Sequence, residues 1–523
     1  MLVGNIQIPA GDTRAKGDQA MTNEPGLKIL IRAQLHSKRE ALVDEAGSYT
    51  YQKLLQASDD VASTLLAGRN DLREARVAFL IPPSFEYTAI LWGIWRAGGI
   101  AVPLCITHPV PELEYVVTDA DAEILIVHPD HLERLAPVEK MHSRQFISSA
   151  ELFNHETTPI FPDVEIERRA MILYTSGTTG KPKGVVTTHA NICAQVTTLI
   201  DFWEWRETDR TLGVLPLHHV HGIINILSCA LWSGGCCELL EKFDADKIWK
   251  LFIERDYTLF MAVPTVYVKL IEAWEKAAPE QQIKMADACR KMRLMVSGSA
   301  ALPVTIFNKW KSITGHTFLE RYGMTEIGMG ISNPLNGERK PGYVGVPLPG
   351  VAVRLVDEDG KIIQEEEIPG EIQIKGDNVF KEYWRRQQET QKAFLDGWFL
   401  TGDTAVVEDG YYRIMGRNSV DIIKTGGYKV SALEIEETLR THPDIKECAV
   451  VGIADEVWGE RVAAAVVLKS DIVLSLPELR TWAKSKIASY KVPKELLLVE
   501  DLPRNAMGKV TKPDVKNCFR RQG

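Results

Sequence analysis

The run YTSGTTGKPKG, from Tyr174 to Gly184, constrains the fold of this chain more than any other segment. It follows an apolar run, MILYT from Met171, which is typical of a buried strand. Residues 176–180 supply three hydroxyls and two glycines, so hydroxyl and backbone N–H groups can converge on phosphate oxygens. Lys181 and Lys183 add positive charge, and the spacing differs from that of a Walker A loop. The segment predicts a strand followed by a phosphate-binding loop.

Strand-like and helix-like segments alternate through the first two thirds of the chain. VAFLI from Val77 and ILIVH from Ile124 are strand-like, whereas Tyr87 to Ala97 is helix-like, which predicts an α/β fold. After Gly350 the shorter segments VAVRLVDEDGKII and EIQIKG alternate around Asp-Gly turns and predict an antiparallel β subdomain. We therefore expect a multi-domain α/β (α+β) protein.

The length of 523 residues exceeds what one hydrophobic core can support. We expect a flexible tail over residues 1–26, a large N-terminal domain over 27–417 and a small C-terminal α+β domain over 418–523. In the small domain SALEIEETLRTHP predicts a capped amphipathic helix, ECAVVGIAD and RVAAAVVL predict strands, and a further helix is expected around Trp482.

Composition excludes several classes of protein. The formal net charge of -9 argues against a nucleic-acid partner, and no apolar run reaches the ~20 residues that cross a bilayer. Eight cysteines without a CxxC pair predict reduced thiols. Residues 1–26 mix basic Arg14 and Lys16 with acidic Asp12 and Asp18, unlike a secretory or mitochondrial signal. We expect a cytoplasmic protein, with a mitochondrial or other organelle matrix as the alternative.

Further motifs follow the phosphate loop in a fixed order. They are GSAALP from Gly298, YGMTE from Tyr322, TGD from Thr401, GR at Gly416 and PRNAMGK ending at Lys509. With YTSGTTGKPKG, this series resembles the adenylate-forming superfamily, which includes acyl-CoA synthetases, luciferases and peptide-synthetase adenylation domains. The resemblance covers nearly the whole chain after residue 27. It implies an ATP-dependent carboxylate:CoA ligase that forms an acyl-adenylate and uses ATP, Mg²⁺ and coenzyme A.

The resemblance also assigns roles to individual residues. Lys509 would offset the negative charge that develops when a carboxylate attacks the α-phosphorus of ATP. Glu326 would hold Mg²⁺, with Thr325 beside the phosphates. Asp403 would accept hydrogen bonds from the ribose hydroxyls, with Arg417 near the same sugar and phosphate. Other residues placed on ATP are Thr175, Ser176, Gly177, Thr178, Thr179, Lys183, Gly298, Ser299, Ala300, Tyr322 and Gly323.

Acyl transfer to coenzyme A is the second half-reaction of this superfamily, whose members rotate the small domain between the two halves. DIIKTGGYKV from Asp421 resembles the segment that faces the thiol, with Gly426 and Gly427 leaving room for the pantetheine arm. Many relatives have Asp or Lys two residues after the Arg, where this chain has Ser419. The hinge residue therefore stays open.

The acid that is activated depends on the acyl pocket. The cluster LHHVHG holds His218, His219 and His221, and without a fourth partner it more often lines a pocket than binds a metal. By resemblance His221, Lys269 and Arg321 border the acyl site. An arginine buried there needs an anionic partner, which the second carboxylate of a diacid would supply. The chain looks closest to the malonyl-CoA synthetases, which activate malonate and methylmalonate.

Two other functions stay open. One is a ligase for a short or medium monocarboxylic acid, in which Arg321 pairs with a protein carboxylate such as Glu320. The other is a non-catalytic nucleotide or acyl-CoA sensor. A peptide-synthetase adenylation domain would need a carrier partner in trans. We infer no obligatory protein partner.

Overall fold

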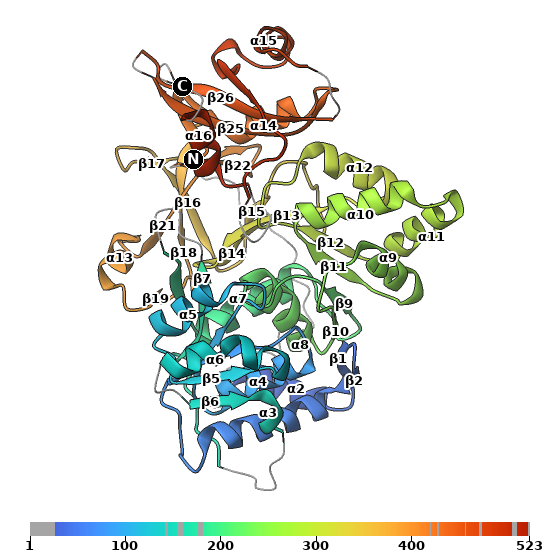
Figure 1. The fold of residues 1–523 in the computed structure, drawn as a ribbon, viewed down its shortest axis with the longest axis vertical. Helices are drawn as coiled ribbons and strands as arrows, with labels where there is room; N and C mark the ends of the chain where they lie inside the picture. Colours follow the sequence, from blue (N-terminus) through green and yellow to red (C-terminus); the bar gives the residue numbers. More distant parts are fainter. Residues whose placement is uncertain are drawn as a thin grey trace.

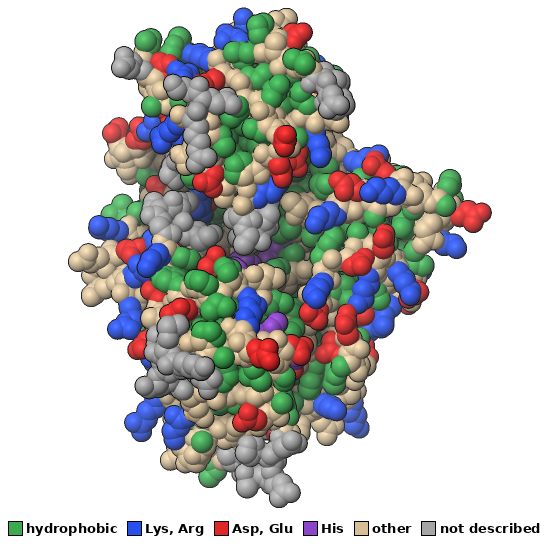
Figure 2. Space-filling model, viewed as in Figure 1, with side chains coloured by type: hydrophobic (Ala, Val, Ile, Leu, Met, Phe, Trp, Pro, Cys, Tyr) green, Lys and Arg blue, Asp and Glu red, His purple; other side chains and the backbone are tan. Residues whose placement is uncertain are grey.

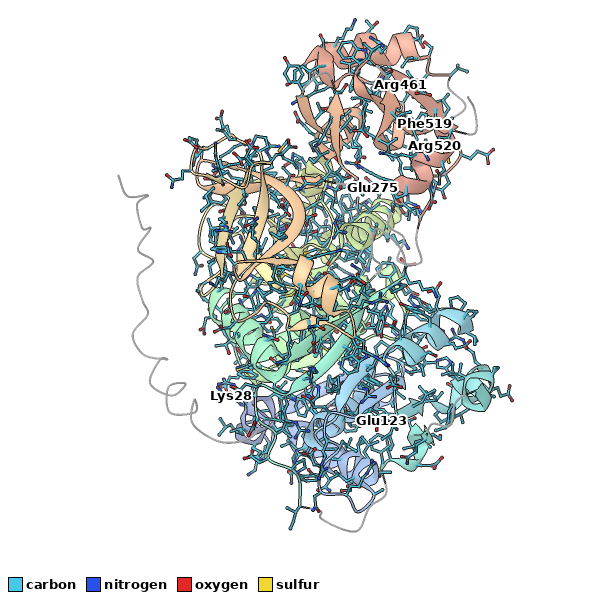
Figure 3. The ribbon with its side chains drawn as sticks, turned by 90° about the vertical axis from the view of Figure 1, so that its left-hand side faces the viewer. Lys28, Glu123, Glu275, Arg461, Phe519 and Arg520 are labelled. Atoms are coloured by element: carbon cyan, nitrogen blue, oxygen red, sulfur yellow. The ribbon has the colours of Figure 1, made fainter. Side chains whose placement is uncertain are left out.

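The structure is a computed structural model, and it describes residues 27–141, 145–153, 160–175, 181–418, 420–425, 428–455, 457–469, 473–504 and 510–520. A smaller C-terminal lobe (orange to red) stands above a larger body (Figure 1). A view turned by 90° places Arg461, Phe519 and Arg520 in the upper lobe and Lys28 and Glu123 in the lower body (Figure 3). The predicted α/β fold with a smaller C-terminal part is confirmed.

The lower body contains a seven-stranded sheet in the order β19-β8-β7-β4-β3-β5-β6, in which β8 and β19 are antiparallel to their neighbours. Helices α3 and α4 pack so closely that a Cβ at Gly93 would lie 2.4 Å from Cγ1 of Val61. The strands are β3 (Arg76–Leu80), β4 (Ile100–Pro103), β5 (Ile124–Val127), β6 (Gln145–Ser148), β7 (Arg169–Thr175), β8 (Lys183–Thr188) and β19 (Glu382–Tyr383). The helices are α2 (Lys28–Leu35), α3 (Tyr51–Leu66), α4 (Phe85–Arg96), α5 (Val110–Asp119), η2 (Pro129–His131), α6 (Leu132–Met141) and η3 (Ser149–Glu151).

A nine-stranded sheet follows the order β15-β14-β13-β12-β11-β9-β10-β1-β2, and its strands from β13 to β1 are parallel. Helices α9 to α12 cover its outer side (Figure 1) over a core that includes Trp249, Tyr267 and Trp310. The strands are β1 (Glu40–Asp44), β2 (Gly47–Thr50), β9 (Arg210–Gly213), β10 (Cys236–Leu239), β11 (Leu259–Ala262), β12 (Leu294–Ser297), β13 (Leu319–Met324), β14 (Gly328–Ser332) and β15 (Val346–Pro347). The helices are α7 (His189–Phe202), the π-helix η4 (His221–Ser228), α8 (Cys229–Ser233), α9 (Ala245–Glu254), α10 (Pro264–Lys276), α11 (Pro279–Arg290) and α12 (Val304–Thr314).

The segments after Gly350 form the expected antiparallel sheet, in the order β17-β16-β18-β21-β20 with β22 paired to β21. Its elements are β16 (Ala352–Val356), β17 (Ile362–Ile363), β18 (Gly370–Lys375), α13 (Gln387–Lys392), β20 (Phe394–Leu395), β21 (Trp398–Glu408) and β22 (Tyr411–Arg417). The prediction of an antiparallel β subdomain is confirmed.

The C-terminal lobe is a five-stranded sheet, β24-β23-β26-β25 with β27 paired to β26. The predicted capped helix is α14, where the Ser431 hydroxyl accepts a hydrogen bond from the N–H of Glu434 at 3.2 Å. The elements are β23 (Ile422–Thr425), β24 (Tyr428–Ser431), α14 (Ala432–Leu439), β25 (Ile445–Asp455), β26 (Gly459–Leu468), α15 (Leu476–Lys484), η5 (Ser489–Lys491), β27 (Glu495–Leu498) and α16 (Lys512–Arg520). Both predicted strands and the helix around Trp482 are therefore confirmed.

Side-chain contacts between described residues join the C-terminal lobe to the body. Glu437 of α14 accepts a hydrogen bond from the N–H of Val304, at the start of α12, at 2.9 Å. Lys424 pairs with Glu358 at 3.0 Å. Among the described residues, no helix is long and apolar enough to cross a membrane.

Candidate active site

Several predicted site residues converge where β12 and β13 end. These strands are parallel neighbours, with Ser297 opposite Glu320, so their carboxyl ends open on the same edge of the sheet. Gly298 and Ser299 follow β12, and Arg321 is the third residue of β13, one position beyond the residue opposite Ser297. Ligands of open α/β sheets bind at this edge. Figure 2 shows histidine side chains in the hollow at the middle of one face.

Arg321, Ser299 and His221 form one polar cluster. Arg321 donates to the Ser299 hydroxyl at 3.4 Å, and that oxygen lies 3.2 Å from Nδ1 of His221. Ser299 has a φ of 67°, a left-handed conformation that is uncommon outside glycine and is concentrated at functional sites. His221 opens the π-helix η4, and π-helical turns are also frequent at functional sites. The structure therefore brings together three of the predicted site residues.

Arg321 is buried at 4% exposure, and no carboxylate lies within ion-pairing distance of it in the described part of the chain. Burial lowers the pKa of its guanidinium to about 9, because no carboxylate among the described residues offsets the loss of solvation. Glu320 does not pair with it, because neighbouring strand residues point to opposite faces. The Glu320 carboxylate instead accepts a hydrogen bond from the N–H of Gly342 at 2.9 Å. The expected pairing of Arg321 with Glu320 is therefore wrong, while the monocarboxylic-acid ligase stays an alternative function.

Gly298 leaves the space that the guanidinium occupies, since a Cβ there would lie 2.5 Å from Cζ of Arg321. For the malonate activity that the resemblance implies, we predict that Gly298→Ala displaces the guanidinium and lowers kcat/KM by roughly 10- to 100-fold, because a shift of ~1 Å in a positioning group has effects of this size. Steady-state kinetics with malonate and acetate would measure it. An equal loss with both acids would contradict the prediction and indicate that Gly298 acts on ATP binding.

Asp403, Tyr322 and Arg417 form a second cluster. Asp403 lies directly opposite Arg417 in the β21–β22 register, and its Oδ1 accepts a hydrogen bond from Nε of Arg417 at 3.2 Å. Its Oδ2 accepts from the Tyr322 hydroxyl at 2.7 Å. Burial raises the pKa of Asp403, and the charge of Arg417 opposes that rise. The cluster presents a carboxylate that is held from two sides, as an acceptor for a diol requires.

Glu326 lies in the turn after β13 and is buried. Its carboxylate accepts a hydrogen bond from the Tyr383 hydroxyl at 2.9 Å, and the Lys183 ammonium lies 5.0 Å from the centre of the Tyr383 ring. Lys183 also pairs with Glu389 at 2.6 Å. Sequence reasoning missed Tyr383 and Glu389, since nothing local marks them and both lie far along the chain from the site residues that they contact, Glu326 and Lys183. Tyr383 thus connects the strand after the phosphate loop to Glu326.

The structure places the remaining residues as follows. Thr175 ends β7 opposite Lys183, and Thr325 is half-buried in the turn after β13. Ala300 is exposed. A Cβ at Gly323 would lie 2.0 Å from the carbonyl oxygen of Gly328, so this position requires glycine. The predicted site residues that lie outside the described residues are Ser176, Gly177, Thr178, Thr179, Gly426, Gly427 and Lys509, together with the hinge position Ser419.

Lys269 does not join the Arg321 cluster. It is exposed on α10, with its ammonium 5.2 Å from the centre of the Phe243 ring. Two residues earlier, Tyr267 faces the sheet and donates to the carbonyl oxygen of Val296 at 2.8 Å. Helix residues two apart do not face the same way, so Lys269 points away from the sheet. The contacts in the structure give no support to its assignment to the acyl pocket.

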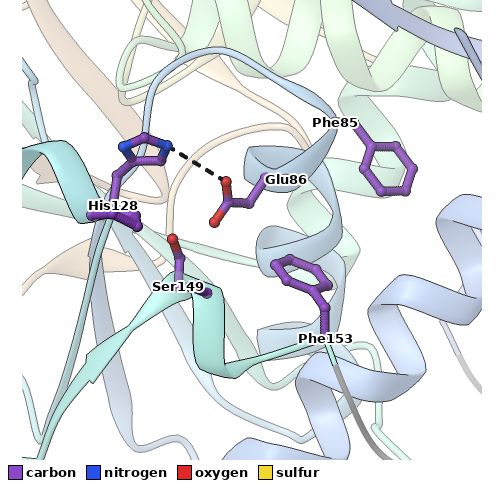
Figure 4. A pocket seen from close by; sticks show the side chains of 7 residues that line it. Phe85, Glu86, His128, Ser149 and Phe153 are labelled. Carbon is purple, nitrogen blue, oxygen red and sulfur yellow. Dashed lines mark ion pairs between the residues drawn. The ribbon is translucent and has the colours of Figure 1, made fainter. Parts of the chain in front are cut away.

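A separate cavity of about 290 Å³ lies in the lower body, and none of the predicted site residues lines it. Nε2 of His128 lies 3.9 Å from a Glu86 oxygen beside the cavity (Figure 4), and the buried Ser149 hydroxyl has no hydrogen-bond partner among the described residues. Phe85 and Phe153 form its apolar side. The cavity is distinct from the clusters around Arg321 and Asp403.

Comparisons with known proteins agree with this geometry. A family model described as "AMP-binding enzyme" matches residues 31–384, and one described as "AMP-binding enzyme C-terminal domain" matches residues 434–509. These two models together span most of the chain.

Individual relatives match over nearly their whole length. The "Malonate--CoA ligase ACSF3, mitochondrial" of Mus musculus is 46% identical over 93% of this chain and 90% of its own. The "Malonate--CoA ligase" of Arabidopsis thaliana is 41% identical over 92% of this chain and 87% of its own. Among solved structures, ATP-bound MatB from Rhodopseudomonas palustris matches with a TM-score of 0.85 and 33% identity, over 95% of this chain and 99% of its own.

Proposed function

Because the chain belongs to the AMP-binding enzyme family, we propose that it is an AMP-forming malonate:CoA ligase. It converts malonate, ATP and coenzyme A into malonyl-CoA, AMP and diphosphate. The observation that carries the choice of acid is Arg321, a buried guanidinium without a carboxylate partner in the described residues. The names of the mouse and Arabidopsis relatives support the same acid.

The reaction has two steps. One malonate carboxylate oxygen attacks the α-phosphorus of ATP, which gives malonyl-adenylate and diphosphate. The coenzyme A thiol then attacks the acyl carbon, which gives malonyl-CoA and AMP. We propose that Arg321, with Ser299 and His221, binds the carboxylate of malonate that does not react. A bidentate pair between this carboxylate and the guanidinium would offset the free-energy cost of burying Arg321. A monocarboxylic acid lacks the second carboxylate, so the pair would make the enzyme selective for diacids.

We propose that the remaining residues serve the nucleotide. Asp403 accepts hydrogen bonds from the ribose hydroxyls while Tyr322 and Arg417 hold its carboxylate in place. Residues 176–180 and Lys183 bind the phosphates, and Thr325 lies beside them. Lys509 offsets the charge that develops in the first step. Gly426 and Gly427 leave room for the pantetheine arm in the second.

Glu326 is the residue we propose for Mg²⁺. Burial raises the pKa of its carboxyl, while hydrogen bonds from its own backbone N–H and from Tyr383 oppose the rise. A buried carboxylate whose charge is not fully compensated suits a hard cation that prefers oxygen ligands. Bound there with ATP, Mg²⁺ would neutralise phosphate charge.

We predict that Glu326→Gln raises the Mg²⁺ concentration needed for half-maximal adenylation by roughly 10- to 100-fold, because the amide keeps the shape but removes the charge. Diphosphate release titrated with Mg²⁺ measures this. Tyr383→Phe is a control that removes the hydroxyl and keeps the carboxylate, and its effect should be smaller. An unchanged Mg²⁺ curve for Glu326→Gln would place the cation elsewhere.

The function is tested by a substrate panel. Diphosphate release is measured with malonate, methylmalonate, acetate and octanoate, each with and without coenzyme A. We expect kcat/KM for malonate to exceed that for acetate by at least about 30-fold, the equivalent of ~2 kcal/mol. A preference for acetate or octanoate would establish the monocarboxylic alternative. Release with none of the acids would favour the sensor.

Domain limits and compartment are also proposals. We propose that residues 27–417 bind ATP and the acid, and that 418–523 form the lid that rotates between the two steps. In support, β22 ends at Arg417 and the next sheet begins at Ile422.

The word mitochondrial in the mouse relative's name favours that organelle over the cytoplasm, which a fluorescent fusion of the full chain would test.

A further inference from the structure

We propose that Cys105, His108 and His218 form a binding site for a transition-metal cation of the Zn²⁺ class, next to the acyl pocket and separate from Glu326. One ligand atom of each residue lies within 4.8 Å of the other two. Ligands of one tetrahedral Zn²⁺ lie roughly 3.3–3.6 Å apart, so small side-chain adjustments complete the site. A thiolate and two imidazoles select such a cation over Mg²⁺, which prefers oxygen.

The site is assembled from two distant segments. Cys105 and His108 follow β4 of the seven-stranded sheet, whereas His218 follows β9 of the nine-stranded sheet. The histidine-rich loop by itself lacked further ligands, and the fold supplies them from more than a hundred residues away. A cation bound here would tie the two sheets together.

The groups around the three side chains favour metal binding. Oε2 of Glu112 lies 3.2 Å from Nδ1 of His108, one helical turn away. A carboxylate on Nδ1 leaves Nε2 as the ligand and makes the imidazole more basic, an arrangement common among metal-bound histidines. Arg134 donates hydrogen bonds to the carbonyl oxygens of Ile106, at 2.6 Å, and His108, which fixes the loop backbone. The loop is therefore held in a ligand-ready position.

The position of His218 connects this site to the proposed function. It lies three residues before His221, whose ring contacts Ser299 beside Arg321. A cation bound by His218 would hold the start of η4, and with it one wall of the acyl pocket. Three protein ligands leave a fourth tetrahedral position for water. Metal binding by these three side chains does not depend on which acid the enzyme activates.

The test is a Co²⁺ titration of the full chain with excess Mg²⁺ present to occupy oxygen sites. We expect one Co²⁺ to bind per chain. The spectrum should show the visible absorption bands of tetrahedral Co²⁺ and a thiolate-to-cobalt charge-transfer band in the near ultraviolet. Cys105→Ser should lose the charge-transfer band. The matched control Cys518→Ser, which changes a half-buried thiol on α16, should keep it. Zn²⁺ should displace Co²⁺ and abolish the spectrum.

Two outcomes would overturn the proposal: a natural chain without the charge-transfer band at stoichiometric Co²⁺, or a Cys105→Ser protein that retains it. If Cys105→Ser does not fold, Glu112→Gln on the exposed side of α5 takes its place. That variant should bind Co²⁺ roughly 10- to 100-fold more weakly with the band intact. Unchanged affinity would count against the assignment. None of these readouts depends on ligase activity.

Discussion

Replacing Arg321 with methionine is expected to lower kcat/KM for malonate by roughly 30-fold to several thousandfold. The guanidinium is buried and has no carboxylate partner in the described residues. In the complex we propose, the second malonate carboxylate supplies that partner, and breaking such a pair costs on the order of 2–5 kcal/mol. At 1.4 kcal/mol per decade, this range gives the expected loss. Diphosphate release with malonate and with acetate measures it.

Kinetics with acetate distinguish a loss of malonate recognition from general damage to the enzyme. Acetate has no second carboxylate, so its kcat/KM should change little or rise in Arg321→Met. Arg339→Met is the matched control, because Arg339 is also a partly buried arginine but donates to the backbone carbonyls of Thr317 and Leu335 at 2.8 and 2.7 Å. That variant should lose stability while it keeps the ratio of malonate to acetate. Unchanged malonate kinetics in Arg321→Met would refute the malonate assignment.

Lys509→Ala is expected to slow malonyl-adenylate formation by at least about 10²- to 10³-fold, the effect of removing one group aimed at transition-state charge. Isotope exchange between diphosphate and ATP reports this step alone. Transfer from synthetic malonyl-adenylate to coenzyme A should stay within a few-fold, because no charge develops on diphosphate in that step.

Lys516→Ala is the control for Lys509. Lys516 pairs with Glu460 at 3.5 Å in the same C-terminal segment, and a partly exposed pair of this kind contributes ~1 kcal/mol or less. Loss of the Lys516–Glu460 pair should leave the rates of both half-reactions nearly unchanged. If Lys509→Ala slowed the two half-reactions equally, the lysine would act on the C-terminal lobe as a whole and not specifically on the adenylation step.

Local segments of the fold were predictable where local physics determines them. The fully buried run ILIV became β5, and Ser431 caps α14 as its spacing from Glu434 predicts. Lys269 shows the limit of this reasoning. Motif resemblance placed it at the acyl pocket, but helical periodicity points it away from the sheet that carries Arg321. Tyr383 and Glu389 were missed because the site residues that they contact, Glu326 and Lys183, are distant in sequence.

By itself the sequence determined the family and predicted its chemistry. Phosphate binding, ribose recognition and adenylation each need particular groups at contact distance, and short motifs such as YTSGTTGKPKG, TGD and PRNAMGK keep those groups together on the chain. The tertiary structure alone decided how Arg321 is surrounded and how Cys105, His108 and His218 meet. Whether a buried charge has a partner depends on side chains that come from every part of the fold. No local pattern carries that information.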